Sequence, residues 1–147
     1  MMITEALRGE HGVLNALLEH LEVRLTDAGD LTLLQRLGAM LQAALASHAN
    51  LEEELLFTAL DPHMGGAGPL AVMRMEHQEI EGALAKLPQA ADLAEARGLL
   101  GQVINTANAH FAKEEQVLFP ISNRLLGEAE LIRLGTQWAD HRRVALA

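Results

Sequence analysis

Cysteine and tyrosine are absent from the 147-residue sequence, and aromatic residues make up only 3% of it. Without cysteine the chain can form no disulfide, no iron–sulfur cluster and no thiolate zinc site. Without tyrosine it can carry no tyrosyl radical. Basic residues are also scarce, with 11 Lys and Arg against 20 Asp and Glu and a formal net charge of -9. Nucleic acid, whose phosphates require Lys and Arg, is therefore not an expected partner.

Long hydrophobic runs are missing as well. No apolar stretch approaches the roughly 20 residues of a membrane-spanning helix. The first residues lack the basic and apolar regions of a signal peptide. The absence of cysteine is compatible with a reducing compartment. We therefore expect a cytoplasmic protein with no membrane partner.

Apolar residues, mostly Leu and Ala, recur at helical spacing along most of the chain. The predicted breaks are Ala28-Gly29, the Gly- and Pro-rich segment 61–69, Pro88 and Pro120. They separate predicted helices over about 4–28, 30–60, 69–86 and 91–119, with a shorter fifth helix after Gly127. We expect Pro120 to kink or end the fourth helix. The sequence thus predicts one all-α domain over 1–147, an antiparallel up-down four-helix bundle with an additional short C-terminal helix, 128–147, packed on or beside it.

The predicted helices contain an internal repeat. Glu10-His11 in the first helix recurs as Glu76-His77 in the third. The segment from His48 through Glu52 to Phe57 in the second helix recurs from His110 through Glu114 to Phe119 in the fourth. Each half is therefore a helix pair of similar size, and we expect a pseudo-twofold axis to relate the halves with their histidines facing a common centre.

The repeated histidines and glutamates share helix faces with apolar residues. Residues four positions apart lie on the same face, so His48 projects with Glu52 and His110 with Glu114. A lone buried histidine is more often a packed core residue than a ligand, but two buried carboxylates beside four imidazoles need a positive partner. No buried Lys or Arg is evident in the pattern, so the sequence predicts a bound cation.

The ligand types narrow the choice of metal. Imidazole and carboxylate without thiolate suit iron, manganese, cobalt or zinc. Two central carboxylates on opposite helices can each bridge two ions, which favours a dinuclear site. Four histidines and two bridging glutamates supply about eight of the roughly twelve bonds that two six-coordinate ions need. An oxo or hydroxo bridge adds two more and leaves room for an exogenous ligand; zinc needs fewer ligands and stays an alternative.

At this point the sequence resembles the hemerythrin/HHE cation-binding family, over about residues 5–126. The resemblance rests on Glu-His helices alternating with His-x-x-x-Glu-Glu helices that close in Leu-Phe or Leu-Phe-Pro. It implies a four-helix bundle with a carboxylate-bridged di-iron site. Its implied ligands are His11 and His48 for one iron, His77 and His110 for the other, and Glu52 and Glu114 as bridges.

One position departs from the oxygen-carrying members of that family, which place a second histidine one turn after the third-helix histidine. Here this position is Glu81, which we expect to be an additional metal ligand. A further carboxylate should stabilise the ferric state and weaken reversible oxygen binding. The resemblance therefore favours the HHE branch linked to iron handling, oxygen or nitric-oxide response and repair of iron centres over simple oxygen transport.

Several functions stay open on the sequence alone. The leading expectation is a protein with two oxo- or hydroxo-bridged iron ions that binds or senses O₂, NO or peroxide. Handling of iron without further chemistry, a di-iron oxidase or peroxidase, and repair of iron centres are alternatives. A structural zinc bundle is another, and manganese is an alternative metal. The sequence does not decide whether the protein is an enzyme.

Other polar and apolar residues receive secondary expectations. His20 and His63 should be exposed, and nothing in the repeat assigns His141 a role. The glutamates next to the predicted ligands, which are Glu10, Glu53, Glu76 and Glu115, should either be solvated or orient the imidazoles. Exposed Leu134 and Trp138 on the C-terminal helix suggest a homodimer interface or an unidentified protein partner.

Overall fold

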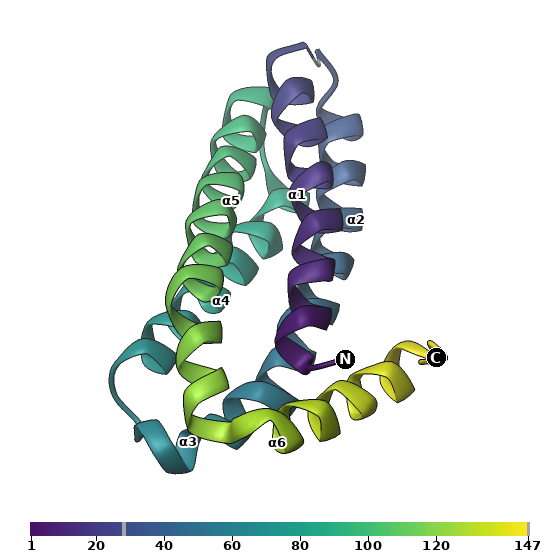
Figure 1. Cartoon of the computed structure of the whole chain (residues 1–147). Helices are drawn as coiled ribbons and strands as arrows, with labels where there is room; N and C mark the ends of the chain where they lie inside the picture. Colours follow the sequence, from purple (N-terminus) through teal and green to yellow (C-terminus); the bar gives the residue numbers. More distant parts are fainter. Residues whose placement is uncertain (28, 147) are drawn as a thin grey trace.

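The computed structural model describes residues 1–27 and 29–146, and its regular elements are all helical over these residues (Figure 1). Helix α1 spans Ile3–Asp27, and α2 begins at Leu31 with Asp30 as its N-cap, accepting from the Thr32 N–H. Helix α4 spans Pro69–Lys86, followed by a 3₁₀ turn, η2, over Leu87–Gln89. Helix α5 begins at Leu93, where Asp92 accepts from the Glu95 N–H. The predicted all-α bundle is confirmed.

Two of the long helices contain a π-helical turn at equivalent places. Helix α2 ends at Leu51 and continues directly into the π segment η1, Glu52–Phe57, and then into α3, Thr58–Met64. Helix α5 ends at Lys113 and continues into the π segment η3, Glu114–Leu118, and then into α6, Phe119–Arg142. Such turns widen the helix by one residue and occur often at functional sites. Both begin at a glutamate of the sequence repeat.

Two predicted helix ends are wrong. The structure stays helical from Asp61 to Met64, because the chain leaves the helix only at Gly65, whose positive φ of 69° suits glycine. Pro120 does not end the fourth helix, because it lies in the first turn after a π segment, where a missing N–H costs little. The chain turns instead at Gly127 (φ 73°, ψ 164°), so the expected fifth helix is the second part of α6.

The four long helices α1, α2, α4 and α5 form an antiparallel bundle. Helix α1 packs against α2 and α5, and α4 packs against the same two helices from the other side. Past Gly127, α6 turns across one end of the bundle, close to the N-terminus (Figure 1). Within the described residues, no helix is both long and apolar enough to cross a membrane.

The apolar core is divided into two clusters. One contains residues such as Leu14, Leu45, Ile80 and Ala107, and the other contains residues such as Leu7, Leu51, Met73 and Leu118. On each bundle helix, the repeated histidine lies between a residue of the first cluster and a residue of the second. A layer of buried imidazoles and carboxylates therefore crosses the middle of the bundle.

Candidate metal centre

Each of the four bundle helices contributes one histidine to this layer. The side chains of His11, His48 and His110 are nearly or fully buried, and that of His77 is 14% exposed. Glu52 and Glu114, the first residues of the two π segments, are both 0% exposed. Six of the seven ligands predicted from the sequence thus lie together in the core.

These six residues form two groups that share both carboxylates. In one group, ligand atoms of His11, His48, Glu52 and Glu114 lie within 4.8 Å of one another. In the other, the same holds for His77, His110, Glu52 and Glu114. The grouping is the one implied by the resemblance: one histidine pair for each of two ions, with two glutamates between the pairs.

A second set of carboxylates holds the outer nitrogens of the imidazoles. The three Nδ1 hydrogen bonds are His11 to Glu115 at 2.8 Å, His48 to Glu10 at 2.7 Å and His110 to Glu76 at 3.0 Å. The Nδ1 of His77 lies 3.9 Å from Glu53. All four outer glutamates therefore face histidines of the layer, as carboxylates that orient metal-binding histidines do at metal sites. Of the two roles expected for these glutamates, this supports orientation of the imidazoles.

These outer bonds determine which nitrogen faces the centre. A neutral imidazole that donates its Nδ1–H to a carboxylate keeps a lone pair on Nε2. The Nε2 atoms of His11 and His110 each lie 3.1 Å from a Glu114 oxygen. The corresponding distances from His48 and His77 to Glu52 are 3.5 Å and 3.4 Å. The lone pairs of imidazole Nε2 atoms thus face the lone pairs of carboxylate oxygens. This arrangement is repulsive unless protons or metal cations lie between these atoms.

Most of the inward-facing atoms lack hydrogen bonds; the exceptions are the Nε2 atoms of His77 and His110, which lie 3.0 Å from each other. Both carboxylate oxygens of Glu52 and of Glu114, and the Nε2 atoms of His11 and His48, are buried without a hydrogen-bond partner. Leaving such groups unsatisfied costs about 1–3 kcal/mol each, and more for charged groups. Imidazole nitrogen and carboxylate oxygen are ligands that iron, manganese and zinc accept. The residues therefore fit a pair of such ions.

Without a bound cation, the charged side chains of the layer shift one another's pKa values. Burial raises the pKa of Glu52, and the nearby charge of Glu114 raises it further. Burial also disfavours the charge on Glu114, but the adjacent imidazoles of His11 and His110, each 3.1 Å away, outweigh it and lower its pKa. Burial opposes protonation of His110, yet Glu114 and the other carboxylates raise its pKa to about 9. In the metal-free protein, protons bound to the imidazoles and carboxylates therefore supply part of the positive charge that metal ions would otherwise provide.

Aromatic rings cover the imidazoles on the side of the core. The Phe111 ring stacks on His11 with centroids 4.3 Å apart, and Phe119 stacks on the same imidazole at 5.6 Å. Phe57 is nearly parallel to His77, with an interplanar angle of 5°. The three phenylalanines of the chain thus pack against the imidazole rings, restrain them and limit the access of water to them.

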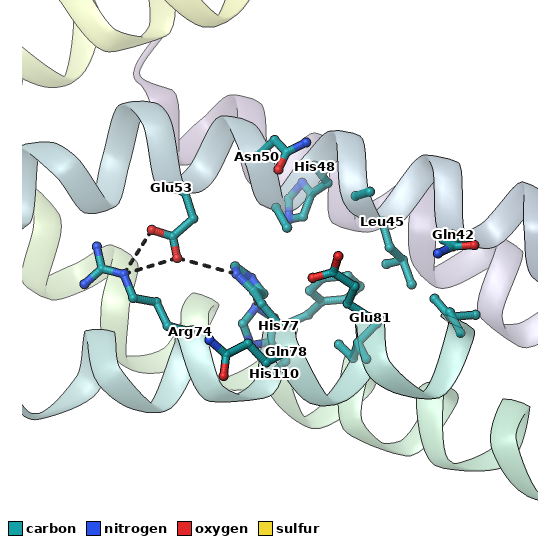
Figure 2. Close-up of a pocket in the computed structure, with 15 residues that line it drawn as sticks. Gln42, Leu45, His48, Asn50, Glu53, Arg74, His77, Gln78, Glu81 and His110 are labelled. Carbon is teal, nitrogen blue, oxygen red and sulfur yellow. Dashed lines mark hydrogen bonds and ion pairs between the residues drawn. The ribbon is translucent and has the colours of Figure 1, made fainter. Parts of the chain in front are cut away.

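A pocket of about 490 Å³ opens between α2 and α4 and reaches the layer (Figure 2). Its lining includes His48, His77 and His110, and Arg74 lies at one side, where its guanidinium bonds Glu53. Glu81, the seventh predicted ligand, also lines this pocket. Its side chain is exposed and belongs to neither four-residue group.

The other histidines lie away from the layer. His20 and His63 are exposed, as expected, although His63 is in the last turn of α3 rather than in a loop. His141 is exposed as well, with its Nε2 3.8 Å from Glu54. Leu134 is 2% exposed and Trp138 packs on the same cluster, so the expectation of an exposed apolar face there is wrong. The homodimer stays a prediction.

Each outer carboxylate has a basic partner that the sequence pattern does not predict. Glu53 bonds Arg74, Glu76 contacts Lys113, Glu115 lies 3.9 Å from Arg8, and Glu10 bonds Arg142. The pairs connect residues that are 21, 37, 107 and 132 positions apart, and no helical spacing relates them. Only the tertiary fold reveals them.

Comparison with known proteins gives one match. The family described as Hemerythrin HHE cation binding domain matches residues 2–122. Among curated proteins and among solved structures, nothing matches the chain significantly. The match covers both repeats with all six clustered residues, in a helical bundle whose core holds two imidazole–carboxylate groups. The chain belongs to the hemerythrin HHE cation-binding domain family.

Proposed function

We propose that this chain is a non-haem di-iron protein that binds or senses a small ligand, O₂, NO or peroxide. The observation that carries the proposal is the pair of four-residue groups sharing Glu52 and Glu114, whose carboxylate oxygens are buried without a hydrogen-bond partner. A single ion would use only one group and leave buried acceptors of the other unsatisfied. Two cations, each between one histidine pair and both glutamates, satisfy the whole layer.

The ligand assignment follows from this geometry. His11 and His48 hold one ion, His77 and His110 hold the other, and Glu52 and Glu114 bridge them. A bound pair of iron ions supplies open coordination positions and redox chemistry for a small oxygen or nitrogen ligand. Three outer glutamates, Glu10, Glu76 and Glu115, bond the imidazoles of His48, His110 and His11 through Nδ1, so that the Nε2 atoms of these rings point inward before a metal arrives.

Access from solvent is one-sided. The His11 imidazole is 0% exposed and lies between phenylalanine rings, whereas His77 and His110 line the pocket between α2 and α4 together with His48. The pocket thus contacts both histidines of the second group but only one of the first, so we expect a small ligand to reach the ion of the second group first. Glu81 lies in the same pocket, one turn after His77 (Figure 2). We propose that a side-chain rotation brings it to this ion as a further anionic ligand.

The test is anaerobic loading with Fe(II), measurement of iron per chain, and the visible spectrum as air is admitted. We expect about two irons per chain and the growth of an oxo-bridged ferric charge-transfer band. Glu52→Gln and Glu114→Gln should each prevent loading of two ions. Glu54→Gln is the matched control, since Glu54 lies in the same π segment as Glu52 but is 61% exposed at its side chain.

The outcomes separate the alternative functions. Loaded protein whose spectrum responds to none of O₂, NO and peroxide would refute the sensing function. Consumption of a reductant with peroxide would identify an oxidase or peroxidase. Zinc that iron cannot displace, or uptake of no more than one ion, would instead favour a structural site and refute the di-iron assignment.

Iron handling is the second candidate, and the pocket is the observation that favours it. The pocket connects solvent to three of the ligand histidines, so an ion can enter and leave without unfolding of the bundle. Transfer of iron from the loaded protein to a chelator should then be fast relative to global unfolding. Release no faster than unfolding would exclude this function.

A further inference from the structure

The second part of α6 lies outside the family match and yet reaches the metal centre. The match ends at residue 122, and α6 continues to Arg142 after its turn at Gly127. Gly135 brings this segment against the N-terminus, because a Cβ there would collide with the Met1 carbonyl oxygen. The segment therefore packs tightly beside the start of α1 (Figure 1).

Two side chains of this segment bond the carboxylate of Glu10. The Trp138 indole N–H donates to Glu10 Oε1 at 2.8 Å. The Arg142 guanidinium donates to Oε1 at 2.6 Å and to Oε2 at 3.1 Å, a forked geometry that fixes the carboxylate plane. The Glu10 side chain is 16% exposed and the Arg142 side chain 25%, so water competes only partly for these bonds.

Glu10 transmits this restraint to a predicted metal ligand. Its Oε2 lies 2.7 Å from His48 Nδ1. The same guanidinium also donates to the hydroxyl and carbonyl oxygens of Ser47, at 2.5 Å and 3.2 Å. Arg142 thus bridges Glu10 on α1, which bonds the His48 imidazole, and Ser47 on α2, which directly precedes His48 in the chain.

The other outer carboxylates are held differently. The basic partners of Glu53, Glu76 and Glu115 are Arg74, Lys113 and Arg8, which belong to α4, α5 and α1. Among the described residues, Glu10 is the outer carboxylate whose basic partner comes from beyond the family match. The two ion positions therefore differ in their supporting residues, although their inner ligands are equivalent.

We propose that Trp138 and Arg142 are positioning residues for His48, so that the C-terminal part of α6 completes the His11–His48 half of the metal centre. This inference rests on the metal-binding function proposed above. Loss of supporting residues around a ligand histidine typically lowers metal affinity by about 10–100-fold. Each substitution here leaves other donors on Glu10, so we expect the lower part of that range.

The test uses Co(II), a divalent probe that accepts the same nitrogen and oxygen ligands as iron. The variants are Arg142→Gln, Trp138→Phe and Arg142→Lys. Arg133→Gln is the matched control, because Arg133 lies on the same helix and pairs with Glu130 at the surface. Affinity is measured by chelator competition, folding by circular dichroism, and each ligand imidazole by its paramagnetically shifted, exchangeable N–H proton resonance.

We expect Arg142→Gln to weaken one of two Co(II) sites by about 10-fold and to speed solvent exchange of one imidazole N–H, that of His48. Trp138→Phe should affect the same resonance less. Arg142→Lys, which keeps the charge but not the fork, should recover part of the affinity. Arg133→Gln should match the wild type in both readouts.

Two results would overturn the proposal while leaving the proposed function intact. In one, wild type and Arg142→Gln both bind two Co(II) ions with equal affinity and identical N–H resonances. In the other, Arg142→Gln changes all four imidazole resonances together with the melting temperature, which indicates general destabilisation. Failure of the wild type itself to bind Co(II) would instead refute the metal-binding function.

Discussion

When no metal is bound, removing the charge of one central glutamate should destabilise the fold far more than removing the charge of the other. Glu114 lies 3.1 Å from both His11 Nε2 and His110 Nε2, and its pKa is lowered despite burial. Glu52 lies farther from its imidazoles, at 3.5 Å and 3.4 Å, and its pKa is raised by burial and by Glu114. Glu114 is therefore the carboxylate that neutralises imidazolium, and Glu52 the one disfavoured as an anion.

This difference gives distinct magnitudes. Replacing Glu114 by Gln leaves a buried imidazolium without the fully buried carboxylate 3.1 Å from its Nε2, and breaking such a buried pair costs about 3–5 kcal/mol. That is a large part of the about 5–15 kcal/mol that stabilises a typical domain. Replacing Glu52 by Gln removes a charge that is already disfavoured and keeps the side-chain volume. We expect its metal-free stability to change by less than about 1 kcal/mol.

The assay is urea unfolding of the EDTA-treated variants at pH 7, followed by helical circular dichroism, with metal loading measured in parallel. The m value should stay constant, so that shifts in midpoint report stability. In the parallel metal-loading measurement, the two variants should show the same reduced metal content, because each lacks one of the two proposed bridging carboxylates. Equal destabilisation of both metal-free variants would refute the assigned charge asymmetry, and retention of two ions by Glu52→Gln would refute bridging.

Three further predictions concern the pocket, the charge of the layer and the turn in α6. Glu81→His places an imidazole one turn after His77, and the ferric band should then reverse when oxygen is removed; irreversible oxidation, as expected for the wild type, would contradict the role given to Glu81. Because the pKa of His110 is raised from 6.5 to about 9, its charged form stabilises the metal-free fold below pH 6.5 and that contribution is lost toward pH 9. Urea midpoints that do not fall across this interval would disprove the assignment. Gly127→Ala forces a side chain into φ 73° and ψ 164°, a nearly glycine-only region, and should cost about 1–3 kcal/mol in thermal unfolding. Gly98→Ala, in an open position on α5, is its control and should be neutral or stabilising.

Local patterns were sufficient to predict most of the fold. The helical spacing of apolar residues and the N-cap at Asp30 placed the bundle helices, and α4 begins and ends at the predicted residues, 69 and 86. The predicted stops at Asp61 and Pro120 failed because the chain turns instead at the nearby glycines with positive φ, Gly65 and Gly127. The π turns at Glu52 and Glu114 were not predicted, since no composition rule marks an extra residue in a helical turn.

The inner part of the site was predictable because it repeats. His48 with Glu52 and His110 with Glu114 share a face by helical geometry alone, and the resemblance supplied the order of the pairs. The outer carboxylates and their basic partners depend on contacts between helices. Arg142 is 132 residues from Glu10, and the turn at Gly127 alone directs the helix toward it. Glu81 as a ligand depends on a rotamer and stays a prediction.

The outer carboxylates are exchanged between the halves of the chain. Glu10 and Glu76 bond the histidine of their own helix pair, whereas Glu115 bonds His11 and Glu53 faces His77 of the opposite pair. The same reciprocity is found in a two-fold dimer interface, where each partner contributes the same contact to the other. Neither helix pair by itself holds a complete four-residue group, because each group includes both Glu52 and Glu114. An ion in either group would therefore connect the two halves and hold the bundle together at its centre.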